Sequence, residues 1–275
     1  MVTLIQCRDR VGLVAGITRV LAEKELNIIA MREYVDTEAQ HFFARIVTDH
    51  FADEGALTAE LRKVLPGEAT VTINPQTDKK VVVLVTKEHH CLSDLLVRNH
   101  FKTLGASIQC VVGNHNVLQD ICNKFGVPFH YVPHENKSRD EFETEILESI
   151  GRYDHEYLVL AKFMRILSPS FISRYPSRII NIHHSFLPAF IGANPYRQAY
   201  ARGVKIIGAT AHYVSNDLDQ GPIIGQQVVH VDHTYTAADM VKAGMEVEKS
   251  VLAKALTFVF EDRVFVYNNR TIVFE

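Results

Sequence analysis

Two spacings of apolar positions alternate along the first 75 residues. Apolar residues recur at helical intervals over 13–21 and again over 57–65, where Pro66-Gly67 closes the second stripe. The runs between these stripes are typical of strands. The order of elements predicts a βαββαβ unit of the ferredoxin-like type over residues 1–75. The predicted strands are Val2–Cys7, Ile28–Asp36, His41–Asp49 and Thr70–Ile73.

A polar stretch marks the expected domain boundary, with a linker at 76–80. Strand-like runs then alternate with helical patterns over residues 81–275. Val81–Thr86 has no polar alternation, as expected of a strand that is covered on both faces. This order predicts an α/β domain with a doubly wound, mostly parallel sheet, in which ligands bind beyond the carboxyl ends of the strands.

The second domain is expected to contain six further sheet strands, four helices and a hairpin. The strands are Ser107–Gly113, Val127–Val132, Tyr157–Ala161, Arg178–His183, Ile206–Tyr213 and Ile223–Val231. The helices are Leu92–Leu104, Val117–Phe125, Arg139–Ile150 and Ala237–Phe260. The hairpin joins Val264–Tyr267 to Arg270–Phe274 through Asn268-Asn269.

Composition narrows the class of protein. Of 275 residues, 47% are hydrophobic and 22% charged, which is enough to build a sizeable core. A net charge of −3 argues against a general nucleic-acid binder. Apolar runs stay short of the roughly 18 residues that span a bilayer, so no membrane association and a cytoplasmic location are expected. The four cysteines form no CxxC pair and are expected to be free, buried thiols.

Candidate chemistry gathers in two loops that follow strands. Because side chains alternate along a strand, Asn181 and His183 are expected to share one face. An amide donor beside an imidazole suits a reaction that builds negative charge on a carbonyl oxygen. Asp219 stands just before Gln220-Gly221-Pro222, and if it reaches His183 it orients and tunes that ring.

Two other kinds of site are less well supported. Adjacent histidines on a strand point to opposite faces, and the chain has no HExxH or finger spacing, so no metal site is predicted. Ser185 lies near the two loops without the GxSxG turn that exposes a nucleophile. Cys91 falls at the mouth of the first strand of the second domain, where a structural thiol is favoured over a reactive one.

Three ordered motifs carry a family resemblance. They are Asn181-Ile-His183 with Ser185–Pro188, Leu218–Pro222, and Leu160–Pro169. Together they closely resemble the folate-dependent formyltransferase domain of glycinamide ribonucleotide formyltransferase and methionyl-tRNA formyltransferase, over roughly Val81 to Phe260.

The resemblance implies a role for each matched residue. Asn181 would stabilise the oxyanion, His183 would transfer the proton, and Asp219 would hold and tune His183. The pterin would bind beside Met164–Leu167 and beside the loop that leads to Asp219. For Met164–Leu167, ordinary strand-to-helix packing is the alternative. The implied folate-binding residues are Met164, Arg165, Ile166 and Leu167, with Ser215, Asn216 and Leu218.

The acceptor side of the site departs from the transferases. In glycinamide ribonucleotide formyltransferase a Gly- and Ser-rich loop after the first strand holds the acceptor's phosphate. The equivalent stretch here, Lys87–Ser93, has no glycine, and Glu88 would repel a phosphate, although Lys87 could partly offset that. Water is the simplest acceptor left. The whole chain then resembles the formyltetrahydrofolate deformylase family, which hydrolyses 10-formyltetrahydrofolate to tetrahydrofolate and formate, feeding one-carbon and purine metabolism.

That resemblance implies the folate as substrate and no bound prosthetic group. The residues expected on the side of the water or acceptor are His184, Lys87 and His90. His184 stands where the transferases usually have proline; it is expected either to order the water or to pack against the following loop, and both readings stay open.

The N-terminal unit resembles an ACT regulatory domain through its turn Cys7–Leu13, although the family usually has proline where Arg8 stands. The resemblance implies a homo-oligomer. It also implies an amino-acid effector site at a subunit interface; assembly alone, without an effector, is the alternative. The implied effector residues are Asp9, Val11, Gly12, Leu13 and Asn27.

Two rival functions come from other classes. One is a transferase that formylates a different amine. The other is a folate or amino-acid sensor that retains the fold without catalysis. A sensor has no need of Asn181, His183 and Asp219 together, so their presence argues against the second rival.

Overall fold

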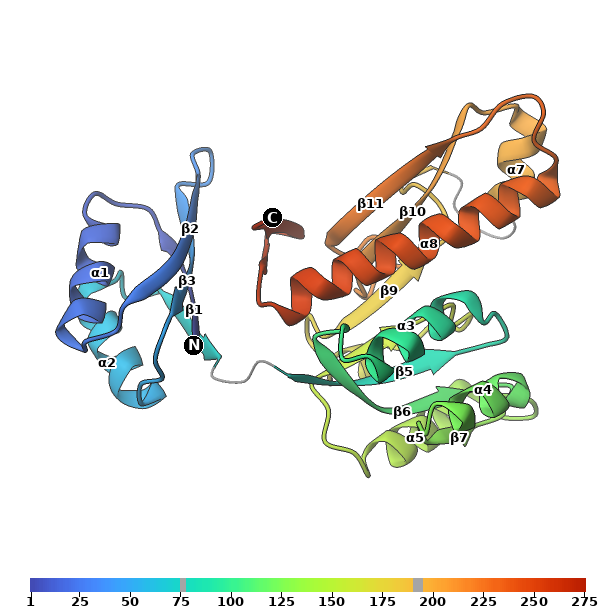
Figure 1. The fold of residues 1–275 in the computed structure, drawn as a ribbon, viewed down its shortest axis with the longest axis horizontal. Helices are drawn as coiled ribbons and strands as arrows, with labels where there is room; N and C mark the ends of the chain where they lie inside the picture. Colours follow the sequence, from blue (N-terminus) through green and yellow to red (C-terminus); the bar gives the residue numbers. More distant parts are fainter. Residues whose placement is uncertain (75–77, 190–194) are drawn as a thin grey trace. The chain divides into compact units, whose positions relative to one another are not determined.

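The computed structural model describes residues 1–74, 78–189 and 195–275, and the chain divides into two compact units (Figure 1). The first unit is a four-stranded antiparallel sheet with two helices. Its strands lie in the order β2-β3-β1-β4, which is the ferredoxin-like arrangement. The elements are β1 (Val2–Arg8), α1 (Leu13–Glu23), β2 (Ile28–Asp36), β3 (His41–Thr48), α2 (Glu54–Val64) and β4 (Thr70–Asn74).

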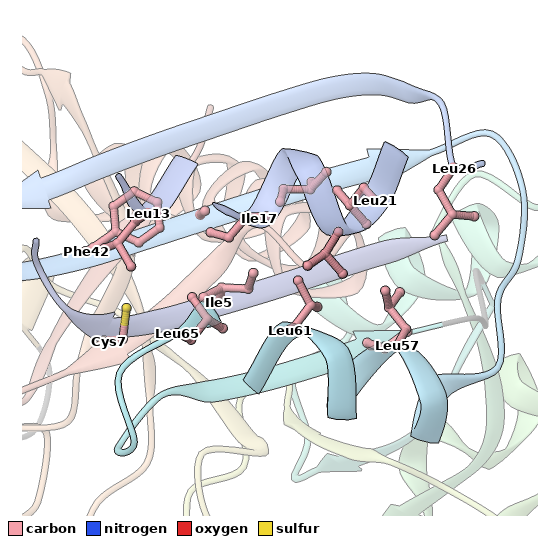
Figure 2. Packing of buried hydrophobic residues seen from close by; sticks show 14 residues of the cluster. Ile5, Cys7, Leu13, Ile17, Leu21, Leu26, Phe42, Leu57, Leu61 and Leu65 are labelled. Carbon is pink, nitrogen blue, oxygen red and sulfur yellow. The ribbon is translucent and has the colours of Figure 1, made fainter. Parts of the chain in front are cut away.

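One apolar core holds this first unit together, and both helices contribute to it (Figure 2). Gly12 adopts a left-handed φ of 90° where the chain turns from β1 into α1, a conformation that suits glycine. The side chain of Asp53 caps α2 by accepting from the amide of Ala56. The labelled core residues are Ile5, Cys7, Leu13, Ile17, Leu21, Leu26, Phe42, Leu57, Leu61 and Leu65.

The second unit is built on a seven-stranded sheet in the order β11-β10-β9-β8-β5-β6-β7. Its strands are β5 (Lys79–Val85), β6 (Ala106–Gly113), β7 (Phe129–Tyr131), β8 (Tyr157–Leu160), β9 (Ile179–His183), β10 (Ile206–Tyr213) and β11 (Ile223–His230). Its helices are α3 (His90–His100), η1 (Asn116–Leu118), α4 (Gln119–Lys124), α5 (Arg139–Ile150), α6 (Pro169–Ile172), α7 (Pro195–Arg202) and α8 (Ala237–Phe260).

The direction of the strands creates a binding edge. Strands β5 to β9 are mutually parallel. Strand β10 runs antiparallel to β9, and β11 runs antiparallel to β10, so only β10 opposes the direction of the other strands. The chain builds outward from β5 through β6 and β7, then returns to add β8 and β9 on the other side of β5. The carboxyl ends of β5 and β8 therefore flank a switch point, where doubly wound sheets bind ligands.

The pattern of apolar positions located the main elements, and the differences lie at their ends. Residues 75–77 of the polar boundary lie outside the described residues, and β5 begins at Lys79, so the last two residues of the expected linker are strand. The reason is burial, because the Lys79 side chain is only 3% exposed. The short helices α6 and α7 were not predicted, since neither is long enough to show a helical period.

The predicted C-terminal hairpin is confirmed as β12 (Val264–Tyr267) and β13 (Arg270–Val273), with left-handed Asn268 and Asn269 at its turn. The second domain was expected to span residues 81–275. At its C-terminal end the compact units divide differently, because Glu261–Phe265 and Val273–Glu275 group with the first unit.

The structure bears on two further predictions, which concern the cysteines and the membrane. All four cysteines are free and buried, as predicted. Among the described residues, no helix combines the length and the apolar character that crossing a lipid bilayer requires.

The loop between β10 and β11 depends on Gly221. A Cβ atom added there would lie 1.8 Å from the carbonyl oxygen of Tyr213, so we expect Gly221→Ala to force the loop open and lower the free energy of unfolding by about 1–3 kcal/mol. Gly225 in β11 is the matched control, because an added Cβ would meet no described atom within 4 Å. Denaturant unfolding of both variants measures the difference, and equal losses would contradict this account.

Candidate active site

The pairing of β9 with β10 places two polar side chains opposite each other. Asn181 is in register with His212, and its Nδ2 lies 3.2 Å from Nε2 of that ring. The other ring nitrogen, Nδ1, lies 2.8 Å from the carbonyl oxygen of Tyr213. Since a carbonyl only accepts, Nδ1 carries the hydrogen and Nε2 accepts from the amide of Asn181. Burial lowers the pKa of His212, which keeps the ring neutral.

His183, at the end of β9, is held at one nitrogen and unpaired at the other. Its Nδ1 lies 3.2 Å from Oδ1 of Asp219 and hydrogen-bonds it. Its Nε2 is buried and has no hydrogen-bond partner among the described residues. An imidazole in this state presents a lone pair at Nε2, which is the requirement for a general base.

Asp219 reaches His183 from the loop after β10. It adopts a left-handed φ of 57°, a region in which asparagine and aspartate are more frequent than other residues that have a side chain. Burial alone would raise the pKa of Asp219, but the hydrogen bond and the charge of His183 lower it overall. Asp219 is therefore ionised near neutral pH and can orient the ring of His183.

These side chains line a cavity of about 690 Å³ at the carboxyl ends of the parallel strands. All seven residues expected to bind folate line the same cavity. Met164 is 47%, Ile166 55% and Leu218 56% exposed, so these apolar side chains face space that a ligand can fill. Leu167 is 6% exposed and also belongs to the core, as the packing alternative expected.

Of the three residues expected near the water or acceptor, only His184 lines the cavity. Its ring stacks on that of His183, with 5.0 Å between the centroids. Burial, with the nearby charges of Lys162 and His183, lowers its pKa to about 4, so the ring is neutral. The other two expectations need correction: Lys87 is exposed away from the lining, and His90 lies buried behind it.

The sequence did not reveal a cluster of buried polar groups around Glu248. This carboxylate, in α8, is 1% exposed and accepts at 2.6 Å from the hydroxyl of Tyr196. Its other oxygen lies 2.7 Å from Nε2 of His90 and 3.1 Å from Nζ of Lys162. These partners hold its pKa at about 2 despite burial, which would raise it. A charged residue on the buried stripe of α8 was the available signal.

A smaller cavity of about 250 Å³ shares the segment from Met164 to Leu167 with the first. The other wall of the smaller cavity carries three basic side chains, and Arg165 lines both cavities. The side chain of Lys137 is already paired with Glu145 at 2.6 Å. The basic residues of this cavity are His134, Lys137, Arg139 and Arg165.

Among the residues that the structure describes, two groups of side chains have the residue types and spacing of metal ligands. In each group the candidate ligand atoms lie within 4.8 Å of one another. In one group, His90 and Glu248 are already hydrogen-bonded to each other. The groups are His90, Cys91 and Glu248, and His115, His134 and Glu135. The expectation of no metal stays a prediction.

The residues expected to bind an effector surround the turn before α1. Asp9, Val11 and Gly12 are exposed, and so is Asn27 after α1. Leu13 is 3% exposed and belongs to the core of the first unit, so its side chain is not available to an effector. The backbone amide of Asp9 donates to the carbonyl oxygen of Gln40.

Comparisons with known proteins define the class of each unit. A formyl transferase family model matches residues 79–256, and an ACT domain model matches residues 1–65. The glycinamide ribonucleotide transformylase 1 of Symbiobacterium toebii matches 72% of this chain and 95% of its own, with 26% identity and a TM-score of 0.69. The second unit is therefore a formyl transferase domain, joined here to an ACT domain.

Relatives that share both domains are more similar. A formyltetrahydrofolate deformylase of Haemophilus influenzae is 50% identical over 272 residues, which cover 99% of this chain and 98% of that protein. The crystal structure of a formyltetrahydrofolate deformylase from Pseudomonas syringae has 39% identity and a TM-score of 0.94, covering 100% of this chain and 94% of its own. The chain belongs to the formyltetrahydrofolate deformylase family of enzymes, and the predicted fold and family are confirmed.

The pKa of His184 predicts how stability depends on pH. Its folded value of about 4 lies below the ordinary 6.5, so the unfolded chain binds more protons between these values. We expect the free energy of unfolding to fall by about 3 kcal/mol at most as pH drops through this window. Denaturant unfolding of wild type and His184→Gln at several pH values measures it.

Protonation of Glu248 affects stability at lower pH than that of His184, so the two effects can be measured separately. Its contribution is present above its ordinary pKa of 4.5 and is lost as pH falls towards about 2. The His184→Gln variant should therefore show a flatter profile between pH 6.5 and 4.5 than wild type. Equal slopes in that range would contradict the assignment.

Proposed function

We propose that this protein hydrolyses 10-formyltetrahydrofolate to tetrahydrofolate and formate. The observation that carries the proposal is the state of His183. One ring nitrogen is bonded to Asp219, the other is buried without a partner among the described residues, and His183 lines a cavity that Asn181 also lines. A base and an amide donor at one cavity are what attack of water on a formyl carbon requires.

In the proposed mechanism, Nε2 of His183 removes a proton from a water as its oxygen attacks the formyl carbon. Asn181 donates to the formyl oxygen as it becomes anionic; one of its two N–H groups is engaged by His212 and the other remains for this role. The bond from carbon to N10 then breaks, and N10 receives the proton from His183. Formic acid leaves and ionises to formate. No prosthetic group enters these steps.

His212 is an added positioning residue in this mechanism. Because its Nδ1–H donates to Tyr213, its Nε2 can only accept, which fixes which end of the Asn181 side chain carries the donors. A reversed amide would present its oxygen to the substrate oxygen and repel the developing charge. The cross-strand pair therefore supports the role of Asn181 in holding the oxyanion.

The smaller basic cavity supports recognition of the acidic end of the folate. A folate carries its reactive nitrogen between an apolar ring system and a glutamate tail with carboxylates. The exposed apolar side chains of Met164 and Ile166 suit the ring system, and the neighbouring guanidinium of Arg165 suits a carboxylate. This arrangement favours a folate over a small formamide as substrate.

The rivals are a transferase for another amine and a catalytically silent sensor. The full coverage of the Haemophilus influenzae and Pseudomonas syringae deformylases favours the hydrolase over both. The supply of formate to one-carbon and purine metabolism is part of the proposal. The homo-oligomer, the amino-acid effector and the cytoplasmic location stay predictions of the sequence.

The proposal predicts that His183→Ala strongly slows formate release. Purified protein with 10-formyltetrahydrofolate and no amine should release formate and tetrahydrofolate in equal amounts. Loss of the base should lower kcat by about 10²–10⁴ with little change in tetrahydrofolate binding. His230→Ala, at an exposed position of β11, is the control. Folate binding without any formate from wild type would refute the hydrolase.

Arg165→Ala should raise KM for the folate about tenfold while kcat stays near wild type, because a carboxylate contact made equally in ground and transition states affects binding alone. The matched control is Arg174→Ala, which is exposed and lines neither described cavity. Steady-state kinetics at two salt concentrations separates the charge effect from a loss of packing. A fall in kcat with unchanged KM would contradict the role in binding.

A further inference from the structure

The Lys162 side chain combines two unfavourable features at the wall of the active-site cavity. It is 4% exposed, so its ammonium group is removed from water. Its backbone has a left-handed φ of 62°, which glycine adopts more readily. A residue kept at such a position against both burial and backbone preference points to a role for its side chain.

Lys162 is held in place by the carboxylate of Glu248. Its Nζ lies 3.1 Å from Oε2 of Glu248 and 4.0 Å from Oε2 of Glu88. The same carboxylate also binds His90 at 2.7 Å and the hydroxyl of Tyr196 at 2.6 Å. With these three partners, both oxygens of the Glu248 carboxylate are engaged.

Gly244, one turn before Glu248 in α8, makes room for this arrangement. A Cβ atom added at Gly244 would lie 2.1 Å from Cζ of Tyr196 and 2.4 Å from its hydroxyl oxygen. The ring of Tyr196 therefore packs directly on the backbone of α8, which brings its hydroxyl to Glu248. The helix, the ring and the buried ion pair together form a closed wall.

This wall lies on the His184 side of the catalytic histidine. Lys162, Glu248 and Tyr196 line the same cavity as His183. The ring of His184 stacks on His183 on one side and lies 6.4 Å from the ring of Tyr196. The ring of His184 thus contacts both His183 and the Tyr196 ring of this wall.

We propose that Lys162, fixed by Glu248, closes the acceptor side of the cavity and selects water over amines as the acceptor of the formyl group. This inference rests on the proposed hydrolase and deepens it by assigning the choice of acceptor. Water is small enough to reach the formyl carbon beside the wall. An amine brings substituents that collide with the lysine stem.

The experiment offers the enzyme a competing amine. Wild type and Lys162→Gly are incubated with 10-formyltetrahydrofolate and a high concentration of glycinamide, and formate, formylglycinamide and tetrahydrofolate are quantified together. In the transfer reaction the amine nitrogen bonds to the formyl carbon, the bond to N10 breaks, and the amine proton passes through His183 to N10. Each tetrahydrofolate is then matched by one formate or one formylglycinamide.

Wild type should yield formate with at most a trace of formylglycinamide, and Lys162→Gly should form formylglycinamide at least about tenfold faster than that trace rate. Glycine suits the left-handed backbone, so the variant should fold. Lys162→Met is the matched control, because it keeps the volume and removes the charge. No formylglycinamide from Lys162→Met would support selection by the volume of the side chain, and formation as fast as with Lys162→Gly would overturn it.

A folded Lys162→Gly protein that binds tetrahydrofolate and forms no formylglycinamide would overturn the inference. If this variant does not fold, Lys162→Asn takes its place, since asparagine also tolerates the left-handed conformation, and the same outcomes apply. Failure of the hydrolase itself would look different. Wild type would then release no formate when the amine is left out.

Discussion

The antiparallel pairing of β9 with β10 is the constraint on which the rest of the site depends. It sets Asn181 opposite His212, and it carries the chain from His212 into the loop that returns Asp219 to His183. A shift of one residue in this register would turn the two β9 side chains to the opposite face of the sheet. The close packing of Gly221 on Tyr213 then fixes the loop at its far end.

Alternation along a single strand made part of this site predictable. Asn181 and His183 are two apart, so their common face follows from strand geometry alone. Asp219 was identified by its turn and by family resemblance, because nothing in the spacing of 183 and 219 indicates a contact. Repeating apolar patterns predicted the two sheets for the same local reason, whereas strand order depends on packing over long distances.

The residues that sequence reasoning missed owe their roles to tertiary contacts. His212 matters because it lies across the ladder from Asn181, and Glu248 matters because α8 buries it against Lys162 and Tyr196. His90 was assigned to the substrate side, but α3 begins at this residue and turns its ring towards α8. Such pairs join segments far apart in the chain, and no local pattern indicates them.

The left-handed backbone at Asp219 is required by the shape of the loop, whereas its carboxylate is required only by the proposed reaction. Asparagine accepts that conformation more readily than aspartate does, and a codon for aspartate becomes one for asparagine by a single base change. Such a change would retain the shape of the loop and remove the negative charge that orients His183. In the proposed mechanism, such a variant would keep its fold and lose the group that orients the base.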